Sequence, residues 1–467
     1  MVTEILNNEI KFGTDGWRAI VGQDFTEENV RKVTHAVGKY VFEEYGIDKK
    51  IIVGYDPRNM ADVFSRQCAE DLASFGFEVL LSEKVIPTPV LAFSAKEKNA
   101  CAIMFTASHN PPEYLGIKFI PDYAGPATQE ITDKIVNNLE VAFEVKGSCK
   151  KLKLENFEEA YYKHIESLVD FEAIQDLDTN IIFDGLHAAS IGYFDKLLDR
   201  HGIEYDSLRM NYDTNFGGGM PEPKPKYMQE LISMVKADGD SIGLANDGDA
   251  DRFGIINENG EYVTPNEIIS ILLLHLVGEK DMDGCLVKTV GASLLLDKVA
   301  QMLNVDVVET AVGFKHVGEA MRLNDCVIGG EESGGLSIKG HIPEKDGILA
   351  NLLVLEAMAY SGKSLVDLQK EIKSLVGCSF VNDRIDLKLE DAGMVDKVLK
   401  IVEKHSSVAG IEVTNKNTLD GVKLYIGDSN WILARPSGTE PLLRIYFEAE
   451  NENILKKMQN DVMSKVK

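Results

Sequence analysis

The segment Thr106–Pro111 (Thr-Ala-Ser-His-Asn-Pro) places a serine beside a histidine, directly after an apolar run. The run Cys101–Phe105 predicts a buried strand, and the Asn-Pro pair predicts a tight loop. A hydroxyl at the end of a strand lies where chemistry usually occurs in an open α/β sheet. Ser108 is therefore a candidate nucleophile, with His109 and Lys118 as nearby groups that could exchange a proton.

A second loop, Asp247–Arg252, carries three carboxylates at alternate positions. Alternate side chains of an extended segment lie on one side of it, so the carboxylates should converge. Such oxygen ligands suit Mg²⁺, which takes few protein carboxylates and completes its shell with water or phosphate oxygen. A solvated acidic turn is the alternative reading. A calcium loop is rejected, because Arg252 stands where an EF-hand requires glycine.

A third loop, Gly329–Gly335, has paired glycines at both ends. The glycines let the backbone turn sharply and approach a ligand. Between them, Glu331 can accept hydrogen bonds and Ser333 can donate or accept them. Adjacent hydroxyls of a sugar are natural partners for this pair, although an exposed glycine-rich turn is the alternative.

A fourth loop, Arg435–Pro441, combines a guanidinium with two hydroxyls and a glycine, and Arg444 follows it. Together with freely oriented amides, these groups can form a nest for a phosphate dianion. A polar turn between strands is the simpler reading. The four loops are informative because they occur together in one chain.

The four loops, and their order along the chain, resemble those of the α-D-phosphohexomutases. This family includes phosphoglucomutases, phosphomannomutases and phosphoglucosamine mutases. Lys11–Arg18 and Gly54–Arg58 resemble further motifs of the family. The resemblance covers nearly the whole chain and is greatest to a bacterial-type phosphoglucomutase. It implies an isomerase that interconverts hexose 1-phosphate and hexose 6-phosphate through a phosphoserine and a sugar 1,6-bisphosphate.

The resemblance also implies a role for each loop. Glucose 1,6-bisphosphate would be the activator and intermediate, and one Mg²⁺ per chain the metal. Lys118 would be the general base, with a pKa lowered by cations such as Arg18, and His109 is the alternative base. The implied catalytic residues are Ser108, His109, Lys118 and Arg18, and the metal ligands are Ser108, Asp247, Asp249 and Asp251. The implied substrate-binding residues are Arg252, Lys315, Glu331, Ser333, His341, Lys345, Arg435, Ser437, Gly438, Thr439 and Arg444.

The identity of the hexose depends on finer resemblances. Gly313–His316, His341–Gly347 and Glu332 resemble the glucose-type branch, so glucose is the expected sugar. Arg435–Pro441 instead resembles the mannose and dual-specificity branches, which leaves a phosphomannomutase or a dual-specificity enzyme as the alternative. Gly334–Gly335 departs from the Gly-His of several phosphomannomutases and phosphoglucosamine mutases. The remaining alternatives are a phosphoglucosamine mutase, a phosphatase, and a non-mutase protein that binds or synthesises a sugar bisphosphate.

Composition is consistent with an acidic enzyme that acts on small molecules. The 467 residues carry a formal net charge of −26, which disfavours nucleic acid and anionic membranes as partners. Hexose phosphates are therefore the expected ligands, bound in a locally cationic cleft of a monomer or homodimer. The six cysteines are far apart, so we expect reduced thiols in a cytoplasmic protein. The first residues lack the apolar core of a signal peptide, and the apolar stretch 268–277 is too short to span a bilayer.

The elements that would position these loops follow an α/β pattern. Apolar strands are predicted at 50–54, 77–81, 180–184 and 284–288, and helices at 61–75 and 191–198. Three similar units of this kind predict three α/β sandwich domains. The last part resembles the family's smaller α+β (TBP-like) domain, and the four domains would surround a central cleft. The expected domains are 1–148 with the phosphoserine loop, 149–258 with the metal loop, 259–375 with the sugar loop and 376–467 with the phosphate loop.

Overall fold

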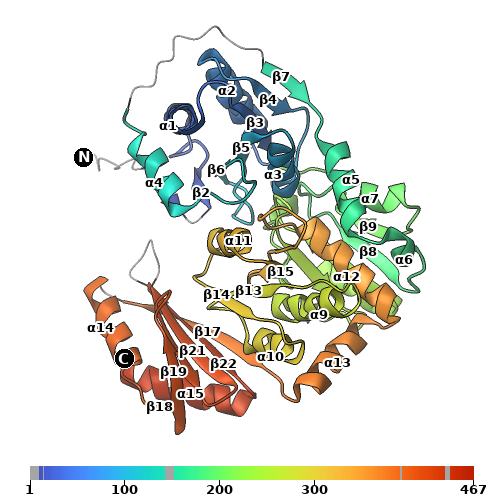
Figure 1. Cartoon of the computed structure of the whole chain (residues 1–467), viewed down its shortest axis with the longest axis vertical. Coiled ribbons are helices and arrows are strands. Elements are labelled where there is room, and N and C mark those ends of the chain that lie inside the picture. Colours follow the sequence, from blue (N-terminus) through green and yellow to red (C-terminus); the bar gives the residue numbers. More distant parts are fainter. Residues whose placement is uncertain (1–9, 14, 142–151, 390–391, 437–441, 467) are drawn as a thin grey trace.

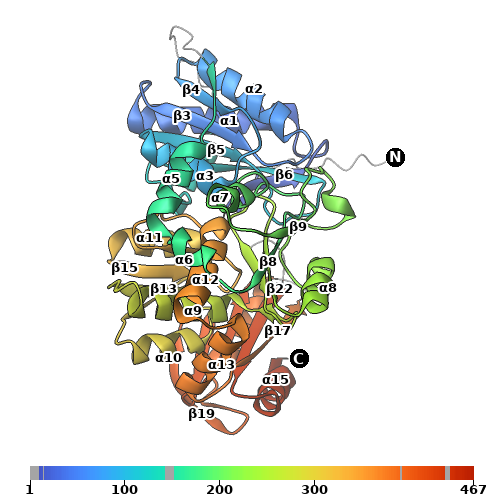
Figure 2. The same ribbon diagram turned by 90° about the vertical axis from the view of Figure 1, so that its right-hand side faces the viewer.

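The computed structural model describes residues 10–13, 15–141, 152–389, 392–436 and 442–466. Four sheets follow one another along the chain, and each belongs to its own unit (Figure 1). In Figure 2 the first unit lies above the second and third, and the fourth lies below them. The predicted class, three α/β domains with a smaller C-terminal α+β domain, is confirmed. Across the described residues, each helix is too short or too polar to cross a lipid bilayer.

The first sheet has seven strands in the order β1-β2-β6-β5-β3-β4-β7. Its central strands are buried along almost their whole length, which suits parallel strands that are covered on both faces. The strands are β1 (Phe12–Gly13), β2 (Gly16–Ile20), β3 (Lys50–Tyr55), β4 (Val79–Ser82), β5 (Ala100–Phe105), β6 (Tyr114–Ile120) and β7 (Leu152–Glu155). The helices are α1 (Glu27–Tyr45), α2 (Ala61–Ser74), α3 (Thr88–Glu97) and α4 (Gln129–Asn137). Since β7 pairs with β4, this sheet includes a strand that follows the domain boundary predicted at residue 148.

The second sheet has five strands in the order β12-β11-β10-β8-β9, and the metal loop joins its antiparallel strands β10 and β11. The strands are β8 (Asn180–Asp184), β9 (Asp206–Leu208), β10 (Ser241–Asn246), β11 (Phe253–Ile256) and β12 (Tyr262–Val263). The helices are α5 (Glu158–Leu168), α6 (Phe171–Gln175), α7 (Phe194–Arg200) and α8 (Gln229–Asp238), with a 3₁₀ turn, η1, at Phe216–Gly218.

The third sheet has four strands in the order β14-β13-β15-β16, and the sugar loop joins β15 to β16. A capping box between Thr264 and Glu267 begins its first helix. The strands are β13 (Cys285–Thr289), β14 (Val307–Thr310), β15 (Cys326–Gly330) and β16 (Leu336–Ile338). The helices are α9 (Pro265–Gly278), α10 (Leu294–Met302), α11 (Phe314–Leu323), α12 (Gly347–Ser361) and α13 (Leu365–Val376).

The fourth sheet is antiparallel and has the order β17-β22-β21-β20-β19-β18. Gly377, at φ +72°, ends α13 in the left-handed conformation and leads the chain into this unit. The strands are β17 (Val381–Lys388), β18 (Ser407–Val408), β19 (Ile411–Asn417), β20 (Val422–Ile426), β21 (Asn430–Pro436) and β22 (Leu442–Ala449). The helices are α14 (Ala392–Glu403) and α15 (Glu452–Val466).

The first three units share an apolar core, while the fourth unit has a core of its own. One core extends through the first three units and includes Ile52 of β3, Phe183 of β8 and Leu353 of α12. The fourth unit has its own core, to which Ile445 of β22 belongs. A smaller cluster around Trp431 connects the fourth unit to the third. The first three units therefore form one continuous scaffold, and the fourth packs beside it.

Candidate active site

Ser108 lies in the loop after β5, and its side chain reaches the second unit. Its Oγ donates a hydrogen bond to Oδ2 of Asp247 at 2.7 Å and lies 3.2 Å from Nδ1 of His109. The residue is buried, and its backbone φ is +50°, in the left-handed region that few non-glycine residues adopt. The structure thus brings the candidate nucleophile to the candidate metal loop.

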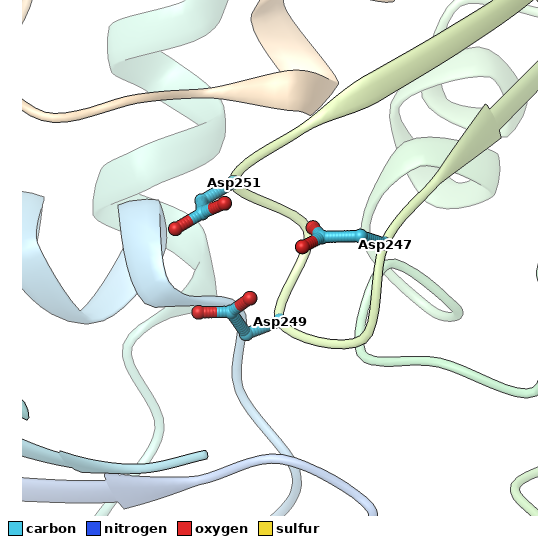
Figure 3. Close-up of side chains that lie close together, drawn as sticks. All are labelled: Asp247, Asp249 and Asp251. Atoms are coloured by element: carbon cyan, nitrogen blue, oxygen red, sulfur yellow. The ribbon is translucent and has the colours of Figure 1, made fainter. Parts of the chain in front are cut away.

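The three carboxylates of the metal loop point toward a common space (Figure 3). Asp247, Asp249 and Asp251 are fully buried, and one oxygen of each lies within 4.8 Å of one oxygen of the others. Among the described residues, Oδ1 of Asp249 and Oδ1 of Asp251 have no hydrogen-bond partner. Burial, together with the two neighbouring carboxylates, raises the pKa of Asp247 well above its usual range. Unpartnered oxygens and mutual repulsion fit a site for a hard divalent cation such as Mg²⁺.

Lys118 of β6 lies against the metal loop, because β6 is the strand next to β5. Its Nζ is 2.8 Å from Oδ2 of Asp249 and 2.9 Å from Oδ2 of Asp251, and Oδ2 of Asp15 is 2.8 Å away. Burial favours the neutral amine, but the carboxylates prevail and raise the pKa of Lys118 well above its usual value. The prediction of a lowered pKa is therefore wrong, because Arg18 is outweighed by Asp15 and the metal loop. In this arrangement Lys118 is a protonated donor.

His109 has the opposite electrostatic environment. Burial, with Arg252 and Arg18 as the next causes, lowers its pKa to about 2. The imidazole is therefore neutral at physiological pH and has a nitrogen beside the Ser108 hydroxyl. Of the two base candidates, His109 is the neutral one, and a pKa of about 2 makes its imidazole a weak base that suits a role in orienting the serine hydroxyl.

A cleft of about 490 Å³ opens beside the buried cluster, a size typical of small-molecule sites. Arg18 reaches it from β2 and donates from Nη1 to Oδ1 of Asn110 at 2.6 Å. The cleft is rich in cations although the whole chain is acidic, so the local field favours an anionic substrate. The predicted site residues that line it are Arg18, His109, Arg252, Lys315, Glu331, Ser333, Lys345 and Arg435.

The sugar loop presents acidic and hydroxyl groups to this cleft. A tight turn, with the amide of Glu331 donating to the carbonyl of Gly335 at 2.9 Å, fixes the loop. Burial raises the pKa of Glu331 to about 7, with neighbouring Glu332 adding to the effect. Glu332 accepts a hydrogen bond from Oγ1 of Thr289 at 2.6 Å. Both carboxylates and Ser333 therefore stand where sugar hydroxyls could bind.

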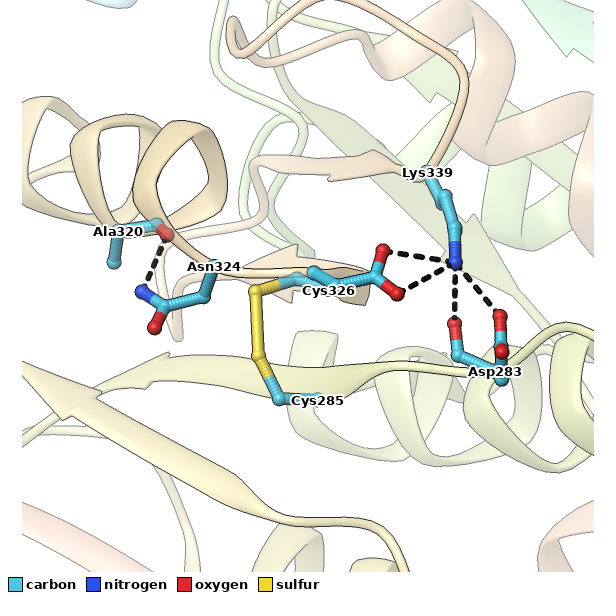
Figure 4. The surroundings of a disulfide bond; sticks show 7 residues. Asp283, Cys285, Ala320, Asn324, Cys326 and Lys339 are labelled. Carbon is cyan, nitrogen blue, oxygen red and sulfur yellow. Dashed lines mark hydrogen bonds and ion pairs between the residues drawn. A yellow bond between two sulfur atoms is a disulfide. The ribbon is translucent and has the colours of Figure 1, made fainter.

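The strand that leads into the sugar loop is joined covalently to its neighbour. Cys285 of β13 and Cys326 of β15 form a disulfide (Figure 4). The parallel register places these two cysteines opposite each other, a contact that their separation in the sequence did not suggest when reduced thiols were expected. The cysteines at 68, 101 and 378 are free.

Arg435 of β21 lines the cleft from the fourth unit. Its Nε donates to Oδ2 of Asp420 at 2.7 Å, and the same oxygen accepts from the amide of Val312 at 3.0 Å. Asp420 thus joins the fourth unit to the third while it orients the guanidinium. Arg444 is the register partner of Arg435 on β22 and is not among the residues that line the cleft. Ser437, Gly438 and Thr439 lie outside the described residues.

His341 is buried and is not among the described residues that line the cleft, where the sequence had predicted it. Its Nε2 lies 3.0 Å from Oδ2 of Asp346, and its Nδ1 lies 2.9 Å from Nε2 of His164. Asp346 also caps α12 by accepting from the amide of Leu349. This cap turns the loop so that Lys345 faces the cleft while the histidine packs into the interior.

Two site residues were missed by sequence reasoning. Thr88, at the start of α3, donates from Oγ1 to Oδ2 of Asp249 at 2.6 Å, and its amide donates to the Asp249 carbonyl. Asp15 binds Lys118 and lies near Arg18. Asp15 stands within Lys11–Arg18, a segment that resembles a family motif, but the sequence suggested no role for it. Thr88 offered only a Pro-Thr-Pro helix start as a signal.

Comparisons with known proteins show the family to which the chain belongs. Models of the phosphoglucomutase/phosphomannomutase α/β/α domains I, II and III match residues 9–145, 159–260 and 264–375, and the C-terminal domain model matches 387–465. The phosphoglucosamine mutase of Methanocaldococcus jannaschii is 31% identical over 91% of this chain and 93% of its own. The phosphoglucomutase/phosphomannomutase of Thermococcus kodakarensis is 31% identical over 94% of this chain and 95% of its own.

A solved structure has the same four-unit arrangement. The crystal structure of a "putative phosphomannomutase" from Thermus thermophilus superimposes with a TM-score of 0.86, at 32% identity over 98% of both chains. Family models, relatives and structure agree along the whole chain. The protein therefore belongs to the phosphoglucomutase/phosphomannomutase family of phosphohexomutases, enzymes of the isomerase class that transfer a phosphoryl group within a sugar phosphate.

Proposed function

We propose that the protein interconverts α-D-glucose 1-phosphate and glucose 6-phosphate, with Ser108 as the phosphoryl carrier. The observation that carries the proposal is the contact between Ser108 and Asp247, which places a nucleophilic hydroxyl against a cation site beside a cationic cleft. A covalent carrier divides an awkward intramolecular shift into two in-line transfers. In the first, a sugar hydroxyl takes the phosphoryl group from Ser108. In the second, the serine takes a phosphoryl group back from the other end of the sugar.

Asp247, Asp249 and Asp251, with an oxygen of phosphorylated Ser108, would hold one Mg²⁺. When bound, the ion would withdraw charge from the phosphoryl group and so ease attack on phosphorus. Two residues of the protein lie beside these groups and contribute to the electrostatics of the site. Lys118 lies at the carboxylates, and the neutral imidazole of His109 lies beside the serine oxygen, which its nitrogen can orient by a hydrogen bond.

Substrate orientation follows from the two ends of the cleft. Arg435 would hold the phosphate that does not react, while Glu331 and Ser333 would bind sugar hydroxyls. The sugar 1,6-bisphosphate must turn around between the two transfers, so these contacts must accept either orientation. The separate core of the fourth unit supports a hinge at Gly377 that lets the phosphate end open and close.

Glucosamine phosphate is the second candidate substrate. The Methanocaldococcus jannaschii relative is named a phosphoglucosamine mutase, and two carboxylates, Glu331 and Glu332, line the cleft where an ammonium group could pair. Mannose phosphate is supported by the names of the Thermococcus and Thermus proteins. Glucose remains the proposed substrate because Glu332 and the segment Gly313–His316 resemble the glucose-type branch.

The deciding experiment measures kcat/KM for glucose, mannose and glucosamine 1-phosphates side by side, with catalytic glucose 1,6-bisphosphate and Mg²⁺ present. We expect the highest value for glucose 1-phosphate. A higher value for glucosamine 1-phosphate would reassign the sugar and leave the phosphoserine proposal intact. If Ser108 became phosphorylated but no monophosphate turned over, the protein would only make or bind a sugar bisphosphate.

A further inference from the structure

The loop that carries Ser108 lies beside a second polar loop of the first unit. Strands β3 and β5 are parallel neighbours, with Tyr55 opposite Phe105 at their ends. The carboxyl ends of neighbouring parallel strands meet at one edge of a sheet, so the chain segments that follow them are adjacent. After β3 the segment is Asp56-Pro57-Arg58, and after β5 it is the phosphoserine loop.

The Arg58 guanidinium binds four backbone carbonyls of the phosphoserine loop. Nη2 donates to the carbonyl of Ser108 at 2.6 Å and to that of Asn110 at 2.7 Å. Nη1 donates to the carbonyl of Pro111 at 2.8 Å and to that of Tyr114 at 3.1 Å. The side chain of Arg58 is fully buried and does not line the cleft, so it does not reach a substrate there.

Asp56 and Thr106 complete the arrangement from the other side of Ser108. Asp56 accepts from the amide of Arg58 at 3.0 Å, and its Oδ2 lies 3.2 Å from Nε of Arg58. The same Oδ2 accepts from Oγ1 of Thr106 at 2.6 Å, and that Oγ1 accepts from the amide of Ser108 at 2.8 Å. Thr106 therefore holds the amide of Ser108, and Arg58 holds its carbonyl. Asp56 binds both of these side chains.

The second unit closes over this group. The ring of Phe216 lies 5.0 Å from Cζ of Arg58, in a cation–π contact. The metal loop approaches the serine backbone so closely that a Cβ added at Gly248 would lie 2.3 Å from the Ser108 carbonyl oxygen. A small displacement of that carbonyl would therefore collide with the loop that holds the metal ligands.

We infer that Arg58, with Asp56 and Thr106, is a positioning group for phosphoryl transfer: it holds the Ser108 backbone in its left-handed conformation so that Oγ faces Asp247. The inference rests on the proposed role of Ser108 as phosphoryl carrier. A left-handed non-glycine residue persists only where its surroundings determine it, and here the surroundings are these hydrogen bonds. The planar guanidinium donates in four fixed directions, which a lysine ammonium cannot reproduce.

The test uses full-length Arg58→Lys and a matched pair, Thr106→Val and Thr106→Ser. The first two variants remove the positioning contacts, while Thr106→Ser keeps the hydroxyl. Arg31→Lys, at an exposed position of α1 in the same unit, controls for loss of an arginine. Each folded protein is measured in single-turnover phosphorylation by glucose 1,6-bisphosphate and in steady state with glucose 1-phosphate.

We expect Arg58→Lys and Thr106→Val to slow phosphorylation of Ser108 and to lower kcat by about 10²-fold, with KM changed less than about threefold, because positioning and not substrate binding is lost. Thr106→Ser and Arg31→Lys should retain nearly full rates. Hydrogen exchange of the 106–114 segment should rise in Arg58→Lys and Thr106→Val alone. If Arg58→Lys does not fold, the Thr106 pair decides the outcome.

A purely structural role would lower the melting temperature of the variants while the folded molecules keep the wild-type rate, and that result would overturn the inference. Failure of the inference is distinct from failure of the proposed function. In the first case wild-type Ser108 is phosphorylated and the variants match it. In the second case the wild-type serine is itself not phosphorylated, and the positioning role is overturned with it.

Discussion

The hydroxyl of Ser108 donates a hydrogen bond to Asp247 across the boundary between the first and second units, although 139 positions separate the two residues in the sequence. Each side chain projects from a loop at the end of a buried strand, and both are almost completely excluded from water. A nucleophile from one sheet thus meets a cation site from another. The contact exists only while the first two units are packed together.

Ser108→Ala should abolish phosphorylation of the protein. Intact-mass analysis after incubation with glucose 1,6-bisphosphate should show one added phosphoryl group on the wild type and none on the variant. Ser74→Ala, at the end of α2, removes an exposed hydroxyl and should be labelled like the wild type. Labelling of Ser108→Ala at any other residue would contradict the assignment.

Asp247→Asn and Asp251→Asn should differ in stability although both lose activity. Each removes a proposed Mg²⁺ ligand, so turnover should fall by several orders of magnitude in both. Oδ2 of Asp251 lies 2.9 Å from Nζ of Lys118 and 3.0 Å from Nζ of Lys345, and these cations lower its pKa despite burial. Its loss leaves Lys345 with Asp15 at 3.7 Å, while Lys118 keeps Asp15 and Asp249, and breaking a buried pair in this way costs about 3–5 kcal/mol.

Asp247 faces Ser108 and lies near two other carboxylates that raise its pKa, so asparagine should be tolerated there. Denaturant unfolding in excess chelator measures both free energies without bound metal. A depressed pKa stabilises the fold above the unfolded pKa and loses this effect as pH falls, so the Asp251 contribution should be absent in strong acid. Equal destabilisation of both variants at neutral pH would contradict the lysine pairing of Asp251.

Titration of Glu331 should make the activity of the enzyme fall as the pH drops below neutrality. Burial raises its pKa from 4.5 to about 7, so the carboxylate proposed to accept sugar hydroxyls is half formed at that pH and predominates above it. The kcat/KM for hexose phosphate should therefore fall below pH 7 in the wild type and fall less in Glu331→Gln. Since the substrate phosphate also titrates near pH 6, the difference between the two proteins is the quantity to compare.

The same shift has the opposite effect on stability. The folded state holds the Glu331 proton more tightly than the unfolded state, so the contribution of this group to stability declines as pH rises from 4.5 to 7. In Glu331→Gln the free energy of unfolding should therefore change less between pH 4.5 and about 7. A stability profile unchanged by the substitution would show that the carboxyl titrates at its ordinary pKa.

Arg435→Ala should impair use of sugar phosphates more than phosphorylation of the serine by small donors. The guanidinium lines the cleft and is held by Asp420, and its proposed charge-assisted bonds to the second phosphate would persist through the transition state. We expect kcat/KM for glucose 1-phosphate to fall by about 10²-fold, corresponding to roughly 3 kcal/mol.

Phosphorylation of Ser108 by a small activated donor with no second phosphate should be nearly unchanged in Arg435→Ala. Arg384→Ala, on exposed β17 of the same unit, provides a matched control. If Arg435→Ala reduced phosphorylation by the small donor as much as turnover of glucose 1-phosphate, then Arg435 would bind the reacting phosphate and not the distant one.

Much of the fold could be predicted because it depends on short-range patterns. The helical spacing of Phe64, Cys68 and Leu72 predicted a helix over 61–75, and α2 spans Ala61–Ser74. The apolar run before Ser108 is β5, and the stretch 268–277 lies within buried helix α9. The alternating carboxylates of the metal loop converge because a hairpin turn holds them on one side. Residue type and spacing determine these features within one loop or element.

Tertiary structure alone decided the charge states and orientations of the site. Lys118 acquired a raised pKa because Asp15, Asp249 and Asp251 come from distant segments, and the sequence had suggested only the nearby arginine. His341 turned inward because Asp346 and His164 bind its ring nitrogens. Electrostatic energies and hydrogen bonds depend on distance in space, and a one-dimensional pattern records which groups exist but not which of them meet.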